Sequence, residues 1–373
     1  MKIIALVCAL FVFSFASDFS ATASLDVKSC AYSEQNKTLA VYNTKDSLNI
    51  LNKKDLKTIN KFDFKTDEIT SLAFDGANLY AGFAGGEIAK FSDDFSSFAG
   101  MLNLSNLSLD TQITHLHVAN GKIYAVVSKD AFVAYDVASK KLTRANLDGA
   151  YHIATCQILN DAALITSWDR SVFTVNLSTM KAKNLGRLKS VALSAAEINS
   201  GVIFGLASGE ITSLKFDVEA NLTSKQSSAA NLTSEANLTQ TNGKDNSSSN
   251  LTAVKNAQNK ADLNLTSGTT NAILMNSTNL ETKNSANTET KAAPNLIVQI
   301  YKISNSRVKS LLVVQDKVYI GLGNGEILRS DAEFKQIEKI GKNSDAVIKI
   351  FNDEDSVIAV SINGEIQIYK KKS

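Results

Sequence analysis

Two stretches of the chain, LYAGFAGGEI at 79–88 and VYIGLGNGEI at 318–327, repeat almost the same pattern. Looser copies of the surrounding segment occur elsewhere, and in each copy one residue just before the third apolar run marks the same position. These anchors are Asp46, Gly86, Asp130, Arg170, Gly209, Gly325 and Gly364. Successive anchors are 40, 44, 40, 39, 116 and 39 residues apart. A period of this length is typical of solenoids, propellers and repeat arrays, in which every repeat is one supersecondary unit.

The one long interval is explained by an insertion. Without residues 220–294, a tract of 75 residues, the interval of 116 shortens to 41. Residues 220–293 contain no Phe, Tyr or Trp and are dominated by Asn, Thr, Ser, Ala and Lys. Such a segment cannot bury enough apolar surface to offset the loss of chain entropy. The sequence therefore predicts a disordered insertion that separates the third strand of the fifth repeat from its outer strand.

Each repeat contains three short apolar and β-branched runs with an alternating pattern, separated by turn signals such as Asp75-Gly76 and Asn120-Gly121. A fourth run follows the anchor, for example KLTRANL at 141–147. Four antiparallel strands in every repeat are the pattern of a β-propeller blade. We therefore predict an all-β fold, a seven-bladed β-propeller, with blades one to five in 17–219 and blades six and seven in 295–373.

The N-terminus reads as a signal peptide. A single Lys precedes an unbroken apolar run at 3–13, and small residues at cleavage positions follow, ending at Ala16 or at Ala23. The last repeat has no sequence left for an outer strand, and FSATASLDVK at 19–28 is expected to supply it and close the ring. Closure favours cleavage after Ala16. No later segment has the roughly 20 apolar residues that span a bilayer, so we expect a soluble, periplasmic protein.

Cysteine usage and charge exclude some classes of protein. After cleavage only Cys30 and Cys156 remain, which we expect to be buried free thiols rather than a disulfide framework. Cys8 lies inside the apolar run and is preceded by Val7, which argues against a lipid anchor. The formal charge of +2, from 39 basic and 37 acidic residues, gives no electrostatic reason to expect nucleic acid as a partner.

Several Asn residues fit the Asn-x-Ser/Thr glycosylation pattern. The phrase NLT begins at Asn221, Asn231, Asn237, Asn250 and Asn264. An acidic residue stands two places before Asn221, Asn237 and Asn264, and also before Asn36 in the first turn of blade one. This resembles the extended acceptor sequence of bacterial N-glycosylation systems. Chance within an Asn-rich tract is the alternative, but Asn36 lies outside the tract, so we predict glycosylation at Asn36, Asn221, Asn237 and Asn264.

Three histidines are the candidates for a metal site. His115 and His117 alternate on the innermost strand of blade three, and His152 begins the neighbouring innermost strand of blade four. Imidazoles on adjacent strands that line a channel could hold a metal. However, the position of His115 is occupied by other polar residues elsewhere, such as Ser71 and Ser310. A structural role is therefore favoured, and no metal or cofactor is predicted.

The signatures of propeller enzymes are missing. The chain has no Cys-x-x-Cys-His for haem, no Gly-x-Ser-x-Gly elbow, and only Trp168 where quinone-dependent propellers have a Trp in nearly every blade. The glycine anchors Gly86, Gly209, Gly325 and Gly364 are expected to be turns. The Glu that follows each of them is expected to be a surface residue at the start of a strand. We predict that the protein is not an enzyme.

The repeated phrase, its period and the seven copies resemble WD40-like propellers, although Trp168-Asp169 is the single near match to the Trp-Asp dipeptide of that pattern. With the export signal, the chain resembles the NapL family of propellers that accompany periplasmic nitrate reductase in epsilon-class proteobacteria. This resemblance implies a non-catalytic accessory scaffold whose partners are nitrate reductase components or their maturation factors. The turns at 75–78 and 120–122 are its candidate docking residues. The alternatives are a metal- or ligand-binding enzyme that uses the central channel, and an outer-membrane assembly propeller, although such propellers usually carry a lipobox cysteine.

Overall fold

The computed structural model describes residues 19–22, 26–64, 68–104, 112–127, 130–159, 161–198, 201–216, 273–275 and 296–371. These ranges form strands and turns. They contain no helix, and therefore none long and apolar enough to cross a membrane. The predicted signal peptide at 1–16 and the predicted disordered insertion, apart from three residues, lie outside the described residues.

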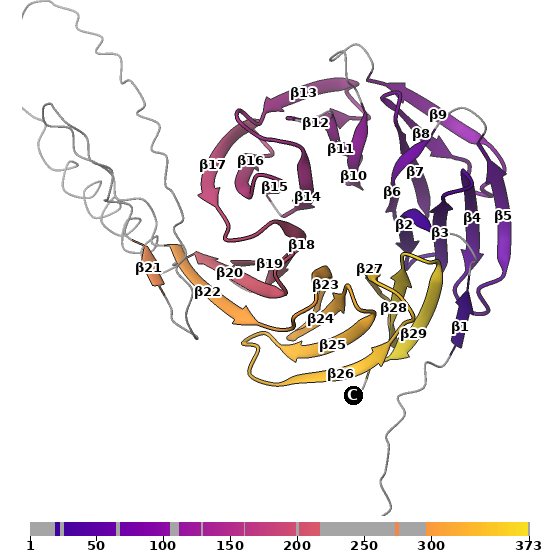
Figure 1. Ribbon diagram of the computed structural model, residues 1–373. Helices are drawn as coiled ribbons and strands as arrows, with labels where there is room; N and C mark the ends of the chain where they lie inside the picture. Colours follow the sequence, from indigo (N-terminus) through magenta and orange to yellow (C-terminus); the bar gives the residue numbers. More distant parts are fainter. Residues whose placement is uncertain are drawn as a thin grey trace, which may run out of the picture. The chain divides into compact units, whose positions relative to one another are not determined.

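The described strands form seven antiparallel sheets, which we number as the blades predicted from the repeats (Figure 1). The chain divides into two compact parts, residues 1–104 with 309–373 and residues 105–308. The first part holds blades one, two, six and seven. Blade one consists of β2 (Val27–Ser33), β3 (Thr38–Asn43), β4 (Ser47–Asn52) and β5 (Thr58–Asp63), and blade two of β6 (Ile69–Asp75), β7 (Asn78–Phe83), β8 (Glu87–Phe91) and β9 (Phe98–Asn103). Blade six consists of β23 (Val308–Val314), β24 (Lys317–Leu322), β25 (Glu326–Asp331) and β26 (Ile337–Lys342). Blade seven consists of β27 (Val347–Asn352), β28 (Ser356–Ser361), β29 (Glu365–Lys370) and β1 (Phe19–Thr22).

The second part holds blades three, four and five. Blade three consists of β10 (Ile113–Ala119), β11 (Lys122–Val127), β12 (Ala131–Asp136) and β13 (Lys141–Asn146). Blade four consists of β14 (Ile153–Ile158), β15 (Ala162–Ser167), β16 (Ser171–Asn176) and β17 (Lys181–Arg187). Blade five consists of β18 (Ala192–Ile198), β19 (Gly201–Leu206), β20 (Glu210–Phe216), β22 (Leu296–Lys302) and β21 (Ile273–Met275).

The N-terminal strand completes blade seven, as predicted. β1 pairs antiparallel with β29, with Phe19 opposite Ile368 and Thr22 opposite Glu365. The first and last parts of the sequence therefore share one sheet. Cleavage of the chain after Ala23 would remove β1 entirely, which strengthens the expectation of cleavage after Ala16.

The insertion separates two neighbouring strands of blade five. β20 ends at Phe216 and pairs with β22, which begins at Leu296, so β22 is the outer strand of this blade. Residues 295–373 therefore contain the end of blade five in addition to blades six and seven. The short strand β21 pairs with the free edge of β22, where Met275 lies opposite Leu296. The composition of the insertion did not predict this strand.

The structure explains the repeated phrase residue by residue. The anchors lie in the turn between the second and third strands of each blade, and six of the seven have positive φ, among them Asp46 at 56° and Gly325 at 85°. In blades one to six the carbonyl oxygen of the anchor also accepts a hydrogen bond from the chain just beyond the outer strand, as when Leu104 N–H donates to Gly86 at 2.9 Å. The anchor thus forms the turn between the second and third strands and also holds the end of the fourth strand by a hydrogen bond. The prediction that the glycine anchors are turns is confirmed.

The earlier glycine in the phrase lets neighbouring blades approach each other. A Cβ on Gly321 would lie 2.7 Å from Val347 Cγ1 of the next blade. Blades one and two pack in a similar face-to-face way, through a cluster that includes Tyr42 and Ile50 on one side and Leu79 and Phe83 on the other. Side chains of alternate residues from adjacent blades therefore form each part of the core.

Replacing the anchor Gly325 with alanine is expected to lower the free energy of unfolding by about 2 kcal/mol, because an L-residue is strained at positive φ. The new Cβ would also lie 2.3 Å from the carbonyl oxygen of Asn343. Denaturant unfolding followed by circular dichroism measures the change. Gly100→Ala is the matched control, since nothing lies within 4 Å of a Cβ at that position. Equal stability of the two variants would contradict the role given to the anchor.

Candidate functional site

The two predicted docking segments are hairpin turns between the first and second strands of their blades. In the first part of the chain, Gly76 has a φ of 59°, and its carbonyl oxygen accepts a hydrogen bond of 2.6 Å from Ser33 Oγ in blade one. In the second part, Asn120 and Gly121 both have positive φ, 54° and 70°, as in tight hairpins of the primed type. Both turns are constrained polar loops, and their docking role remains a prediction.

The glutamates after the glycine anchors begin the third strand of their blades, as expected, but they are not all surface residues. Glu210 pairs with Lys189 at 3.1 Å and Glu326 with Lys339 at 2.8 Å. Glu365 is buried and accepts hydrogen bonds of 2.6 and 2.5 Å from Ser344 N–H and Oγ. Burial would raise the pKa of the Glu365 carboxyl, but these hydrogen bonds outweigh it and hold that pKa below the usual value. Glu365 therefore fastens the turn before β27, and the prediction of a surface role is wrong for this residue.

The histidines follow the predicted strands only in part. His115 and His117 lie on β10, where the register places His115 opposite Val126, equivalent to Ser71 opposite Gly82 in blade two. His152 does not begin β14 but occupies the bend before it, with a φ of 49°. In the ranges that the structure describes, no three His, Cys, Asp or Glu residues are close enough to hold a metal ion.

The two cysteines occupy equivalent positions on the innermost strands of blades one and four, where other blades have residues such as Leu72 and Ile350. Both thiols are free and partly buried. Burial raises the pKa of Cys30 and of Cys156 to about 12. A thiol with so high a pKa is a poor nucleophile and metal ligand at neutral pH, so we assign both cysteines to packing.

Of the four predicted glycosylation sites, only Asn36 belongs to the described residues; Asn221, Asn237 and Asn264 lie outside them. Asn36 is exposed in the turn between β2 and β3. Thr38, whose hydroxyl completes the acceptor pattern, is 2% exposed, and its Oγ1 donates to the Asn36 carbonyl oxygen at 3.2 Å. An enzyme that must read this hydroxyl would reach it before the hairpin forms.

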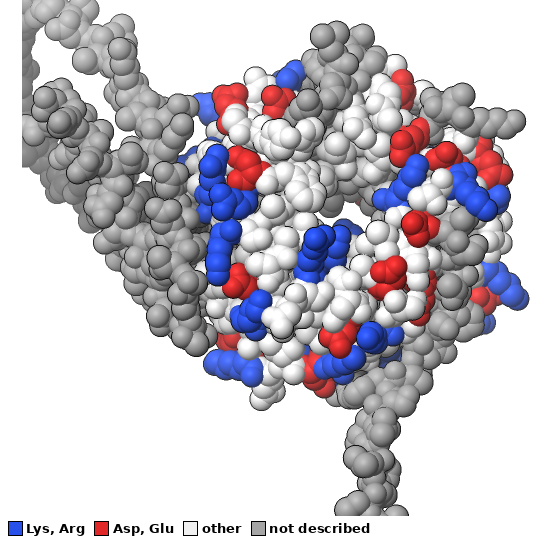
Figure 2. Space-filling model, in the orientation of Figure 1, with Lys and Arg blue, Asp and Glu red and all other residues white. Residues whose placement is uncertain are grey.

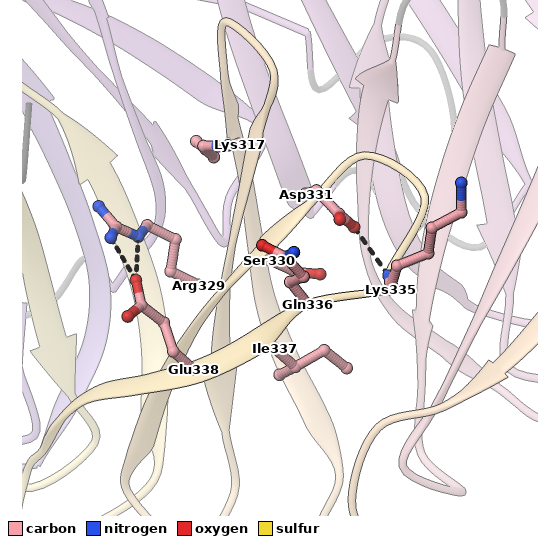
Figure 3. Close-up of a pocket in the computed structure, with 8 residues that line it drawn as sticks. All are labelled: Lys317, Arg329, Ser330, Asp331, Lys335, Gln336, Ile337 and Glu338. Carbon is pink, nitrogen blue, oxygen red and sulfur yellow. Dashed lines mark hydrogen bonds and ion pairs between the residues drawn. The ribbon is translucent and has the colours of Figure 1, made fainter.

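Blade six carries a hollow of about 480 Å³ along β25 and β26 (Figure 3). Its lining includes an ion pair, in which Glu338 accepts hydrogen bonds from the Arg329 guanidinium. Asp331, also in the lining, accepts a hydrogen bond of 2.8 Å from the backbone N–H of Lys335. The Arg329–Glu338 ion pair is satisfied within the blade, whereas Ser330 Oγ in the lining is buried without a hydrogen-bond partner among the described residues. We assign no function to this hollow.

A second hollow, of about 490 Å³, lies between blades one and seven and is built around a buried carboxylate. The Asp353 side chain is 1% exposed. Its carboxylate forms ion pairs with Lys37 Nζ at 2.7 Å and Lys53 Nζ at 2.6 Å, and accepts a hydrogen bond of 2.8 Å from Tyr32 Oη. Burial would raise the pKa of Asp353, but the hydrogen bonds from the two lysines and the tyrosine hold it well below its usual range. We name these four residues the Asp353 cluster; they join the first blade to the last.

The surface charge is mixed. Figure 2 shows basic and acidic side chains interspersed over the described part of the visible face. This agrees with the near balance of 39 basic and 37 acidic residues. A broad area of one sign is what recognition of nucleic acid requires.

Large exposed aromatic residues lie together in blade four. Tyr151 is 63% exposed and Trp168 is 52% exposed. Ser167 Oγ accepts a hydrogen bond from Tyr151 N–H and donates one to its carbonyl oxygen, both at 2.8 Å. Trp168 N–H donates to the carbonyl oxygen of His152 at 2.9 Å. These bonds hold the segment before β14 beside the turn after β15, and we name Tyr151, His152, Trp168 and Arg170 the Trp168 patch.

The Trp168 patch departs from the repeat in two ways. Trp168 stands two residues before the anchor, where blades two and five have Ala84 and Ala207, and the anchor itself is Arg170 instead of glycine. Arg170 keeps the positive φ of an anchor, 76°, with a long cationic side chain. The rings of His152 and Tyr151 pack edge to face, with their centroids 4.7 Å apart.

The residue types of the patch are those of binding hot spots. Trp, Tyr and Arg contribute disproportionately to protein–protein affinity, since each adds a large contact area and a hydrogen-bonding group. The sequence signal was Trp168 itself, a large aromatic residue in a turn, but Phe95 and Phe334 lie in turns and are buried, so that signal did not determine exposure. The Trp168-Asp169 dipeptide instead drew attention as a near match to the WD40 pattern, and the structure places it in the turn between the second and third strands.

No protein-family model matches the chain, and no curated protein matches it significantly. Its similarity to solved structures is extensive. The computationally designed Ika8 protein matches with a TM-score of 0.57 at 14% identity, over 94% of this chain and 98% of that one. The β-propeller domain of Myceliophteria thermophila Cps50 (Swd1) matches with a TM-score of 0.61 at 9% identity, over 96% of this chain and 99% of that one. At these identities the likeness shows the fold alone. The fold is a WD40-like seven-bladed β-propeller, as predicted.

Proposed function

We propose that this protein is an exported, non-catalytic scaffold that binds a partner protein through the Trp168 patch. The observation that supports the proposal most is the exposure of Trp168 and Tyr151 beside Arg170 on a rigid blade. The apolar run at 3–13 supports export to the periplasm. The resemblance to the NapL family suggests the system in which the scaffold acts, namely accessory work for periplasmic nitrate reductase.

A β-propeller suits this role because its turns are held by strands that do not move when a partner binds. In blade four the turn is fixed by the bonds of Ser167 to Tyr151 and of Trp168 to His152. An interface whose backbone is already ordered loses less conformational entropy on binding.

Affinity capture tests the proposed partners. The tagged mature protein is recovered from its native periplasm under mild conditions, and co-purifying proteins are identified by mass spectrometry. Enrichment of nitrate reductase subunits, or of the redox proteins and maturation factors that serve them, is expected. Recovery of the protein alone or with outer-membrane assembly factors would overturn the proposed system. Stoichiometric copper, zinc or iron in the purified protein would instead point to a channel that holds a metal.

A further inference from the structure

The outer strand of blade two differs from most other outer strands in having no charge. β9 reads FAGMLN, and Met101 and Phe98 are 62% and 43% exposed. The outer strands of blades one, three, four, five and six all contain Lys, Arg, Asp or Glu, and β1 is likewise uncharged. Charged residues on an edge strand normally prevent it from pairing with another chain. β9 lacks that protection.

Blade five shows that the apolar end of an outer strand can accept a further strand in this protein. β22 begins with the apolar residues Leu296-Ile297-Val298, and it is at this end that β21, with the sequence Ile-Leu-Met, adds a fifth strand. β9 has the same apolar, uncharged character, and in the described part of the chain no strand pairs with its outer edge.

The direction of the backbone groups shows which residue of β9 is available for pairing. Leu104 N–H points toward β8, where it donates to Gly86 at 2.9 Å. Because the orientation alternates along an antiparallel strand, Leu102 and Gly100 also face β8 and Met101 faces outward. The register shift between Lys90 and Phe91 ends the regular ladder before Gly100. The free edge is therefore centred on Met101.

We propose that the β9 edge pairs with the β9 edge of a second copy of this chain, with Met101 opposite Met101 across a two-fold axis. In an antiparallel pair of this register the two Met101 residues exchange both N–H···O bonds, and Gly100 of one copy lies opposite Leu102 of the other. No like charges face each other, because the strand has none. The same arrangement would cover the exposed Met101 side chains. The contact is short, so the dimer dissociates on dilution.

Cysteine cross-linking of the purified mature protein tests this pairing. Opposite residues of a hydrogen-bonded antiparallel pair have Cα atoms about 5.5 Å apart, within the range that a disulfide spans. The Met101→Cys variant is therefore expected to form a disulfide-linked dimer under mild oxidation. Ile59→Cys, at a 52% exposed position on the outer strand of blade one, is the control and is expected to remain monomeric.

Light scattering supplies the second measurement. The wild-type mass is expected to rise from monomer toward dimer with concentration, and Met101→Lys, which places two ammonium groups opposite each other, is expected to stay monomeric with an unchanged melting temperature. A wild-type monomer at all concentrations, with Met101→Cys no more reactive than Ile59→Cys, would overturn the proposal. A dimer that persists in Met101→Lys would also overturn it and place the contact elsewhere. Partner capture that fails in Met101→Lys, with a monomeric wild type, would assign the edge to a different protein. None of these results depends on the Trp168 patch.

Discussion

Replacing Asp353 with alanine is expected to lower the free energy of unfolding by about 3 kcal/mol, because it removes the buried carboxylate that two lysines and a tyrosine hydroxyl share. The carboxylate is 1% exposed and receives Lys37, Lys53 and Tyr32. The lysine side chains are 36% and 20% exposed and recover some hydration, which places the expected loss at the lower end for a broken buried pair. Urea unfolding at pH 7 measures the change.

Asp355→Ala is the matched control, because this side chain belongs to the same turn and is 73% exposed. A loss below about 0.5 kcal/mol is expected there, as for an exposed ion pair. Equal losses in the two variants would show that the Asp353 cluster does not hold blade one to blade seven.

The same cluster makes a pH dependence testable. The folded pKa of Asp353 is lowered, so its carboxylate stabilises the folded state above its unfolded pKa of about 3.9, and that stability is lost as the pH falls further. The stability difference between wild type and Asp353→Ala should therefore be full at pH 7 and shrink below pH 4. A difference that grows on acidification would contradict the assigned direction of the shift.

Removal of β1 is the second change with a large expected effect. A mature protein that begins at residue 24 lacks the strand that pairs with β29 from Ile368 to Glu365. Loss of this four-residue ladder should lower the free energy of unfolding by about 3 kcal/mol, at roughly 1 kcal/mol for each hydrogen bond. Thermal unfolding of proteins that begin at residue 17 and at residue 24 makes the comparison.

The intact mass of the protein purified from the cells that produce it gives the natural N-terminus. A mature chain that begins at Ser17 is expected, because cleavage after Ala16 keeps β1. A mature chain that begins at Ser24, with unfolding like that of the longer chain, would mean that β1 does not contribute to the closure of the propeller.

The fold could be predicted from sequence because each blade is specified locally. Turn residues such as Gly86 and Gly325 must adopt positive φ, and the alternation of apolar residues sets the strands between them. The insertion was recognisable for the same reason, as a segment without that pattern. Strand β21 was not, because three apolar residues in a polar tract become a strand only where an edge accepts them.

The functional surfaces were harder to predict, because they depend on contacts between distant residues. Asp353 is 321 residues from Tyr32, and no local pattern links them. The burial of Glu365 likewise depends on Ser344 in the preceding turn. The turn position of Trp168 did not determine its exposure, since Phe95 and Phe334 are buried in other turns, and its proximity to Tyr151 required the structure.

Binding through the Trp168 patch is the central claim, and one comparison tests it most directly. Affinity capture from the cells that produce the protein is repeated with a Trp168→Ala, Tyr151→Ala double variant and with Val137→Ala, a control at a 47% exposed position in blade three. Loss of two aromatic hot-spot residues should weaken binding by about 3 kcal/mol or more, over a hundredfold. Partner proteins recovered with the wild type and the control but absent from the double variant are the predicted result. Undiminished recovery by a correctly folded double variant would contradict the account.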